Sequence, residues 1–277
     1  MITKVKGYTS RANPTLLPLA VPGRIETDLL QITNISGLDP VKASISTTQN
    51  SDNPGAAFTG SSLPFRNIVL TIRPNPDWID WTVESLRKLL YLYFQSGLQV
   101  QLVFEDDAKP PVTIFGYVES FVGNQFTKDG TFQISIVCPY PYFTSLNPIV
   151  ITGRTTNVYT PQVIDYDGDV ETGVVVEVDS HAGQAKPSLV KVETGLGTFT
   201  VNNWIDANQK FIMSSVDGDK FVDNVRPADG LVIGLFDYVQ DGSVWPTFDF
   251  GANSFSVITD AGSHDWTLTY YERFGGL

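Results

Sequence analysis

The chain has 277 residues, of which 18 are basic and 30 acidic, so its formal net charge is −12. A chain of this sign repels nucleic acid and anionic membrane surfaces, which argues against tight electrostatic binding to either. Its 42% apolar residues suffice for one large core or two ordinary ones, which argues against disorder. The single cysteine, Cys138, excludes an intrachain disulfide. The sequence has no apolar run long enough to span a bilayer and no secretory signal, so we expect folding in a reducing cytoplasm.

The negative charge is concentrated in the second half of the chain. Residues 1–150 carry 11 basic and 12 acidic residues, a net of −1, and residues 151–277 carry 7 and 18, a net of −11. Three prolines, Pro139, Pro141 and Pro148, lie near this change. We therefore predict two domains, 1–145 and 146–277. The alternative is that acidic turns accumulate in an all-β half.

The first half is predicted to contain strands separated by a long polar excursion. Apolar residues alternate in 41–47, 67–73 and 131–137, which predicts strands with one buried face. Residues 49–64 are rich in Ser, Asn, Gly and Pro and contain one isolated aromatic, Phe58. We predict that they form a contact arm that orders on assembly, because long loops in compact domains are usually functional or disordered. The alternative is a loop without a role.

One helix is predicted, and a hairpin follows it. Val83, Leu86, Leu89, Leu90 and Tyr93 recur at helical spacing between Pro76 and Gly97, with Asp80 or Thr82 as the N-cap. The apolar stripe is expected to pack on a sheet, with binding to a partner's groove as the alternative. Strands at 99–104 and 112–120 are joined by 105–111, whose acidic residues and prolines predict a hairpin tip.

The second half is predicted to be entirely β. Strands are expected at 174–178, 188–193, 198–201, 211–213, 231–236, 254–258 and 266–271. Asp-Gly pairs separate several of them, ending at Gly168, Gly218, Gly230 and Gly242. Short strands at this spacing indicate a sandwich or jelly roll.

The sequence carries no pattern typical of an active site. Its two histidines, His181 and His264, lie in no metal-binding pattern, and neither a G-x-S-x-G elbow nor a phosphate loop occurs. Residues 165–171 alternate carboxylates as a calcium loop does, but Val170 and Val176 stand where an EF-hand needs Gly and Glu. We expect no catalytic residue, no metal and no cofactor. Cys138 is expected to be buried.

Five tryptophans raise the possibility of sugar binding by stacking. They are Trp78, Trp81, Trp204, Trp245 and Trp266. In sandwiches, aromatic residues more often belong to the core or to an interface, and that is the expectation here.

Five short stretches, taken in chain order, carry a resemblance to one known protein family. Residues 32–41 (Ile-Thr-Asn-Ile-Ser-Gly-Leu-Asp-Pro-Val) resemble the family's opening strand and turn, and 64–72 (Pro-Phe-Arg-Asn-Ile-Val-Leu-Thr-Ile) resemble its following strand. Residues 136–143 (Ile-Val-Cys-Pro-Tyr-Pro-Tyr-Phe) are similar to the segment that closes its ring-forming domain. Residues 166–173 and 245–255 resemble its C-terminal galectin-like sandwich. In this order along nearly the whole chain, the motifs resemble the distal tail protein family of siphophage baseplates.

The resemblance implies a mainly β fold and a structural, non-enzymatic role. Residues 1–145 would form a β-sandwich-type, tail-tube-like ring domain with one α-helix and hairpin extensions, and 146–277 a galectin-like β-sandwich. The protein would be a virion component of the distal tail or baseplate, made in the host cytoplasm. It would form a homo-hexamer around a conduit through which DNA passes without specific binding.

The resemblance also implies partners, and the residues suggest where contacts lie. The partners would be the tail tube protein, the tail-associated tip or hub protein and the tape measure protein, with receptor-binding or side proteins outside. Closed cyclic symmetry needs heterologous interfaces. We predict that Asp52 and Phe58 in the excursion, and Glu105, Asp106 and Asp107 at the hairpin tip, contribute to them.

Two other classes stay open at this point. A carbohydrate-binding module for a host-surface saccharide would explain an acidic sandwich with tryptophans, and predicts sugar binding by 151–277. A tail-associated hydrolase predicts turnover of peptidoglycan or polysaccharide, but the sequence shows no nucleophile or metal motif for it.

Overall fold

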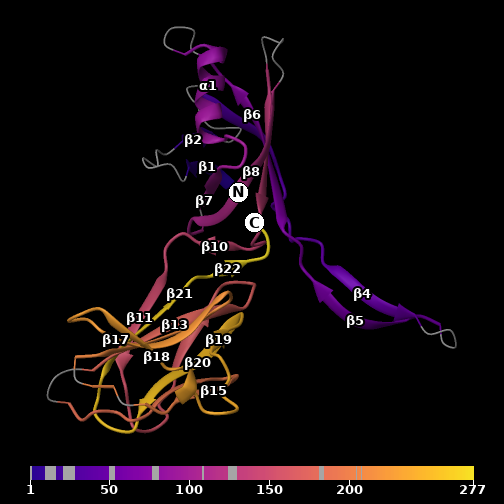
Figure 1. Cartoon of the computed structure of the whole chain (residues 1–277). Coiled ribbons are helices and arrows are strands. Elements are labelled where there is room, and N and C mark those ends of the chain that lie inside the picture. The colour runs from indigo at the N-terminus through magenta and orange to yellow at the C-terminus, as the bar shows by residue number, and fades with distance from the viewer. Residues whose placement is uncertain are drawn as a thin grey trace. The chain divides into compact units, whose positions relative to one another are not determined.

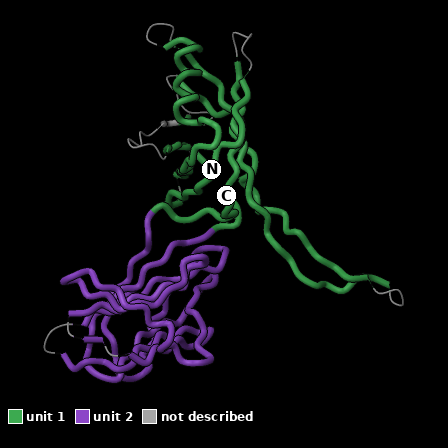
Figure 2. Tube along the Cα trace, in the orientation of Figure 1, with its two compact units in different colours: residues 1–146, 274–277 green, residues 147–273 purple. Residues whose placement is uncertain are grey.

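The chain divides into two compact units (Figure 2), each described here by itself. The first comprises Met1–Leu146 and Phe274–Leu277, and the second comprises Asn147–Arg273. The predicted second domain, 146–277, therefore differs from the structure at its end, because the last four residues belong to the first unit. The computed structural model describes residues 2–9, 17–20, 29–49, 54–76, 81–107, 109–123, 130–180, 184–203, 205–206 and 208–277.

The first unit is built on one curled sheet with the strand order β22-β10-β8-β7-β1-β2-β3-β6-β9 (Figure 1). A further antiparallel pairing joins β9, the last strand of this order, to β8, the third, so the sheet closes on itself. The strands are β1 (Ile2–Thr9), β2 (Leu17–Ala20), β3 (Leu30–Ser36), β6 (Arg66–Pro74), β7 (Gln99–Asp106), β8 (Val112–Gly123), β9 (Phe132–Cys138), β10 (Phe143–Ser145) and β22 (Arg273–Phe274).

Alternating strands supply the core of the first unit. In β6, Ile68, Leu70 and Ile72 are buried, and in β9, Phe132, Ile134 and Ile136 are buried. The two strands pair antiparallel along their length, so these side chains share one face of the sheet. The half-buried strands predicted at 67–73 and 131–137 are therefore confirmed. The predicted hairpin after the helix is also confirmed, because β7 and β8 pair antiparallel.

One α-helix, α1 (Val83–Tyr93), lies against this sheet, as the spacing of its apolar residues predicts. Thr82 is its N-cap: the Thr82 hydroxyl accepts a hydrogen bond from the Ser85 N–H at 3.2 Å, and the Ser85 hydroxyl accepts one from the Thr82 N–H. Leu86 and Leu90 are buried in the core. No helix in the described part of the chain has the length and hydropathy needed to cross a membrane.

The excursion between β3 and β6 is a β-hairpin, which corrects two predictions. Strands β4 (Ser44–Gln49) and β5 (Ala56–Ser62) pair only with each other, as a ribbon that projects from the curled sheet (Figure 1). The strand predicted at 41–47 is present from Ser44 onward, but its predicted buried face is wrong, because all residues of β4 are exposed. The loop predicted at 49–64 is wrong over Ala56–Ser62, because backbone pairing to β4 stabilises a strand there without any buried face.

The second unit contains two larger sheets that enclose one core. One has the order β11-β21-β13-β16-β17-β18, with β19 paired to β13, and the other has the order β12-β20-β14-β15. The elements are β11 (Ile149–Arg154), β12 (Gln162–Tyr166), β13 (Thr172–Asp179), β14 (Val190–Thr194), β15 (Gly197–Val201), β16 (Lys210–Val216), β17 (Asp219–Arg226), β18 (Leu231–Gly234), the 3-10 helix η1 (Phe236–Tyr238), β19 (Thr247–Phe248), β20 (Gly251–Thr259) and β21 (Asp265–Tyr270).

The core of the second unit draws on both sheets. Val174, Val176 and Val178 of β13 are buried together with Phe199 of β15 and Phe255 of β20. Strands occur in all seven predicted regions, although the predicted 231–236 strand ends at Gly234 and is followed by η1. The mainly β fold is confirmed. Sequence reasoning missed β11, β12, β17 and β19.

Candidate interaction surfaces

The β4–β5 hairpin, called the arm below, is exposed along nearly its whole length. Ile45 is 64% exposed and Phe58 is 67% exposed, and neither joins the core. Thr47 lies opposite Phe58, next to a register shift between Ser46 and Thr47. An isolated two-stranded ribbon is marginally stable in water, so the arm gains most from an external surface that covers it.

The residues next to the arm are held by one buried cation, Arg66, the first residue of β6. It is 2% exposed. Its Nε donates to the Pro141 carbonyl at 2.6 Å, and its Nη1 donates to the carbonyls of Gly37 at 2.5 Å and Asp39 at 2.8 Å. Its Nη2 donates to the Gly275 carbonyl. The guanidinium thus ties four segments of the first unit together.

Arg66, its four carbonyl partners and the ring of Phe143 form one cluster, called the Arg66 clasp below. One further contact lies within the clasp, and another lies beside it. The Arg66 guanidinium carbon lies 4.5 Å from the centre of the Phe143 ring, a cation–π geometry. The Leu277 N–H donates to the Leu38 carbonyl at 3.1 Å. The clasp therefore fixes the C-terminal residues of the chain beside the segment that leads into the arm.

Cys138 lies at the end of β9 and is buried, as predicted from the sequence. Burial raises the pKa of its thiol to about 12, against an opposing effect of the Arg66 charge. Gly116 on β8 faces it, where a Cβ would lie 2.8 Å from the Cys138 sulfur and 2.6 Å from an Ile136 methyl. The thiol is therefore enclosed by the contact between β8 and β9.

Native Cys138 is expected to resist alkylation until the first unit unfolds. At pH 8 the buried thiol is protonated, whereas an unfolded chain with an ordinary thiol pKa presents reactive thiolate. Iodoacetamide labelling followed by intact mass should be slow in buffer and rapid in urea. Rapid stoichiometric labelling of the native chain would contradict this placement.

The outer face of β8 carries aromatic side chains that sequence reasoning missed. Phe115 and Tyr117 are exposed, while the residues that alternate with them, Ile114, Gly116 and Val118, are buried. The signal was present, because 112–118 is apolar on both faces of the predicted strand. Scattered apolar residues are ordinary on protein surfaces, but two aromatics on one strand face are a candidate contact.

The four predicted interface residues that the structure describes lie in two places, on the arm and at the end of β7. Asp52 lies outside the described residues, and Phe58 is on the arm. Glu105 and Asp106 end β7, where the Lys6 ammonium forms an ion pair with the Glu105 carboxylate across the β1–β7 pairing. Asp107 follows β7 and is exposed. Figure 1 shows the arm and the end of β7 as separate parts of the first unit.

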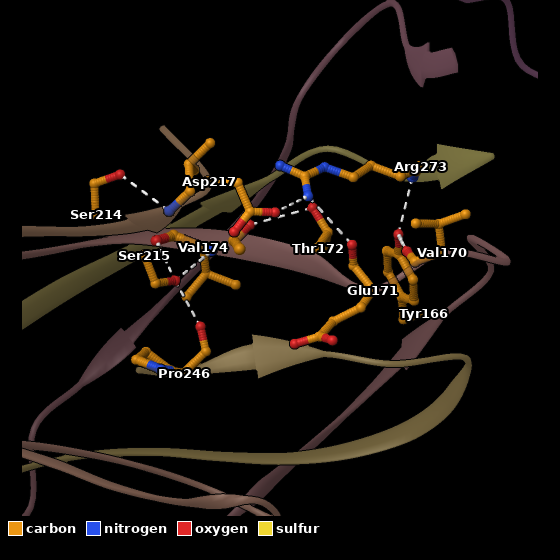
Figure 3. Close-up of polar contacts among 12 residues, drawn as sticks. Tyr166, Val170, Glu171, Thr172, Val174, Ser214, Ser215, Asp217, Pro246 and Arg273 are labelled. Atoms are coloured by element: carbon orange, nitrogen blue, oxygen red, sulfur yellow. Dashed lines mark hydrogen bonds and ion pairs between the residues drawn. The ribbon is translucent and has the colours of Figure 1, made fainter. Parts of the chain in front are cut away.

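In the second unit, the stretch that alternates carboxylates has a structural role (Figure 3). Asp165, Asp167 and Asp169 are exposed, because they alternate with the buried Tyr166 and Gly168. The Tyr166 hydroxyl donates to the Val170 carbonyl at 2.6 Å and accepts from the Arg273 N–H at 2.9 Å. Within the described residues no three His, Cys, Asp or Glu side chains are grouped as metal ligands.

Arg273 extends this network. Its Nη1 donates to the Glu171 carbonyl at 3.2 Å and to the Asp217 carboxylate at 3.0 Å. Nearby, the Ser215 hydroxyl accepts a hydrogen bond from the Val174 N–H at 2.8 Å. Its single proton lies within reach of two carbonyls, that of Pro246 at 2.5 Å and that of Val174 at 3.1 Å. These contacts satisfy buried backbone groups of the second unit around β13, β16 and Arg273 (Figure 3).

The histidine and the tryptophans that the structure describes are buried or pack against the cores of their units. His264 is buried, with its Nε2 within 3.2 Å of the carbonyls of Ala185 and Ala261. Trp266 is buried, and Trp245 packs against Phe199 with ring centres 4.5 Å apart. Trp81 packs on the core of the first unit. His181, Trp78 and Trp204 lie outside the described residues.

Comparison with solved structures yields a match over nearly the whole chain. The Dit protein of phage SPP1, described as a paradigm of the hub adsorption apparatus in phages that infect Gram-positive bacteria, matches with a TM-score of 0.66 and 15% identity, over 98% of this chain and 99% of that one. This chain has the fold of the SPP1 Dit protein. The resemblance to distal tail proteins seen in the sequence is thereby confirmed for the fold.

Other comparisons add less. Two structures of the phage p2 baseplate in its activated conformation, with Sr and with Ca, match with TM-scores of 0.47 and identities of 8% and 9%. They cover 96% and 97% of this chain, and 97% and 98% of the matched chains. No family model and no curated protein matches the sequence.

Within the Dit fold of this chain, Tyr166→Phe is expected to destabilise the second unit by about 2 kcal/mol. The change removes one hydroxyl and leaves the Val170 carbonyl and the Arg273 N–H without that partner. Urea denaturation followed by tryptophan fluorescence measures the loss. Tyr159→Phe is the matched control, because Tyr159 is an exposed tyrosine of the same unit, and it should change stability little. Equal stabilities of the two variants would show that the hydroxyl contributes nothing.

Proposed function

We propose that this protein is a structural component of a phage tail tip that forms a hexameric ring through its first unit. The ring joins the tail tube to the tip and host-recognition apparatus, and DNA passes through it without specific binding. The observation that carries the proposal is the near full-length fold match to the SPP1 Dit protein, which is itself described as part of a hub adsorption apparatus.

Features of the first unit support a ring subunit. The exposed arm and the aromatic face of β8 are different surfaces, as a heterologous interface between neighbouring subunits requires. Residues 1–150 carry a net charge of only −1, which suits a conduit past which DNA slides without being held. Phe58, Asp52 and Asp107 stay candidate contacts. Glu105 is a weaker one, because Lys6 already pairs with it.

The proposed partners follow from this position. The tail tube protein would contact one side of the ring and the tip or hub protein the other, with the tape measure protein in the conduit. Receptor-binding or side proteins would contact the acidic second unit. The role is non-enzymatic, and the virion tail is the site of action.

Native mass spectrometry of the full chain tests the proposal. We expect a species with six times the mass of the chain, alone or after addition of the tail tube protein. A chain that stays monomeric at high concentration and does not associate with tail tubes would overturn the proposal.

A further inference from the structure

The strand β18 is an unusual sheet edge in the second unit. It ends the order β11-β21-β13-β16-β17-β18, and no described strand continues the sheet beyond it. All four of its residues, Leu231, Val232, Ile233 and Gly234, are exposed, and Val232 is 55% exposed. Two exposed aromatics, Phe236 and Tyr238, follow in η1. The edge is therefore apolar and carries neither a charge nor a proline.

The other sheet edges of this unit carry the protection that β18 lacks. Edge strands usually avoid unwanted pairing through charges, prolines or covering segments. Strand β11 ends in Arg154, which pairs with Asp265 at 2.8 Å, and β12 carries the exposed Asp165. Strand β15 is covered by the segment 239–244, whose Gln240 and Val244 amides donate to β15 carbonyls. Only β18, among the four edges of the two larger sheets, is apolar and uncovered by described residues.

The backbone of β18 is oriented to accept another strand. The Leu235 N–H donates to the Val222 carbonyl of β17 at 2.7 Å. In an antiparallel pair, the backbone N–H and C=O groups of successive residues point alternately toward the partner strand and away from it. Those of Ile233 therefore point toward β17, as those of Leu235 do. The N–H and C=O groups of Val232 and Gly234 therefore point to the outer edge. An incoming extended segment can pair with them.

The surroundings of this edge are negatively charged. From Asp223, where β17 begins to pair with β18, to Asp241, the chain contains four aspartates and one cation, Arg226, a net charge of −3. Arg226 is paired with Asp229 at 3.0 Å, at the turn into β18. Asp223 lies opposite Gly234 on β17, and Asp237 is exposed within η1. An apolar edge within an acidic rim selects an apolar segment that is flanked by basic residues.

We propose that β18 binds an extended segment of a basic partner protein by strand addition, with apolar side chains at alternate positions of that segment and Lys or Arg on its flanks. Main-chain hydrogen bonds to Val232 and Gly234 would supply the pairing, and the side chains of Leu231, Ile233 and Phe236 the apolar contact. This inference concerns the second unit and does not depend on ring formation by the first.

A second copy of this chain is a poorer occupant. Antiparallel pairing of two β18 strands would place one acidic rim against another, and like charges across an interface cost free energy. A dimer formed through β18 is therefore the competing outcome that the experiment must distinguish.

The test uses the full chain and a fluorescent synthetic peptide whose central Val-Thr-Val-Thr-Val segment is flanked by lysines. Anisotropy titration should show saturable binding that weakens as salt is raised. The same peptide with glutamates in place of the lysines should bind at least about tenfold more weakly. Equal affinity for the two peptides, or no binding of the lysine peptide, would overturn the proposal.

Two variants and a matched control locate the binding. Val232→Pro removes an outward N–H and should lower the affinity for the lysine peptide at least about tenfold, while the β17 pairing is spared. Val232→Lys keeps that N–H but adds a charge that repels the lysine peptide, and it should also lower the affinity. This variant decides the question if the proline variant fails to fold. Val163→Lys places the same charge on edge strand β12, where Val163 is 70% exposed, and should bind as the native chain does. The proposal would be refuted if a folded Val232→Pro variant bound the lysine peptide as tightly as the native chain does. It would also be refuted if the native chain self-associated and Val232→Pro abolished that self-association.

Discussion

Arg66→Ala is expected to lower the free energy of unfolding of the first unit by about 3 to 5 kcal/mol. The change removes a buried guanidinium that donates to the carbonyls of Pro141, Gly37, Asp39 and Gly275. Those carbonyls lose charge-assisted donors, and the Phe143 ring loses its stacked cation. Urea denaturation followed by tryptophan fluorescence measures the effect.

Arg66→Lys separates charge from geometry. A lysine ammonium keeps the charge but presents its donors at one point, so it cannot reach four carbonyls on three segments or stack on a ring as a planar group does. We therefore expect a loss of about 2 kcal/mol or more for this change. A lysine variant as stable as the native chain would show that the positive charge alone is sufficient. Arg73→Lys is the matched control, because Arg73 is an exposed arginine of the same strand, and it should cost less than about 0.5 kcal/mol.

A local measurement distinguishes loss of the clasp from general destabilisation. The Leu277 amide donates to the Leu38 carbonyl, beside two carbonyls that Arg66 binds. Hydrogen exchange of the C-terminal residues should accelerate in Arg66→Ala even where the rest of the first unit stays protected. Unchanged protection there would contradict the role of Arg66 in fixing the chain end.

Replacement of the arm is expected to abolish ring assembly without unfolding the subunit. Ser44 and Ser62 lie opposite each other at the base of the ribbon, so a short Gly-Ser linker from Ala43 to Leu63 can close the gap. The exposed arm contributes nothing to the core, and the stability of the remaining chain should change by less than about 1 kcal/mol. Native mass spectrometry should then show monomers where the native chain forms the proposed hexamer.

A side-chain variant of the arm is the matched control for its removal. Ile45→Ser with Phe58→Ser keeps the ribbon and removes the two large apolar side chains that it exposes. If these side chains contact a neighbouring subunit, ring assembly should be weaker in the double serine variant. Ring assembly should fail in the variant that lacks the whole arm. Rings that form normally without the arm would exclude it from the interface, while leaving the hexamer itself untouched.

The mainly β character and α1 could be predicted because they depend on local patterns. The stripe from Val83 to Tyr93 repeats at the helical period, and the strands β6 and β9 alternate with a period of two. In each of these elements, the apolar side chains that recur at the period of the helix or strand also lie on one buried face. The pattern and the environment agree, so the prediction succeeds.

The arm could not be predicted in the same way. Residues 41–47 alternate as a half-buried strand does, yet β4 has no layer to cover either face. Strand β5 shows no alternation at all and exists through backbone pairing with β4. Likewise, β18 was predicted as an ordinary strand, and its position at an uncovered sheet edge follows only from the strand order. A sequence pattern indicates which side chains favour burial. Whether another part of the chain covers them depends on the tertiary structure.

The sequence by itself determined the class of this protein: a two-part, mainly β chain, acidic in its second half, with one helix and without a recognisable catalytic motif. Only the tertiary structure decided how its ends are held and which edges it exposes. Arg66 binds carbonyls that lie between 27 and 209 residues away in the chain, and no local pattern can encode such a site. A backbone carbonyl is present at every residue, so sequence carries no signal for which of them will meet a buried cation.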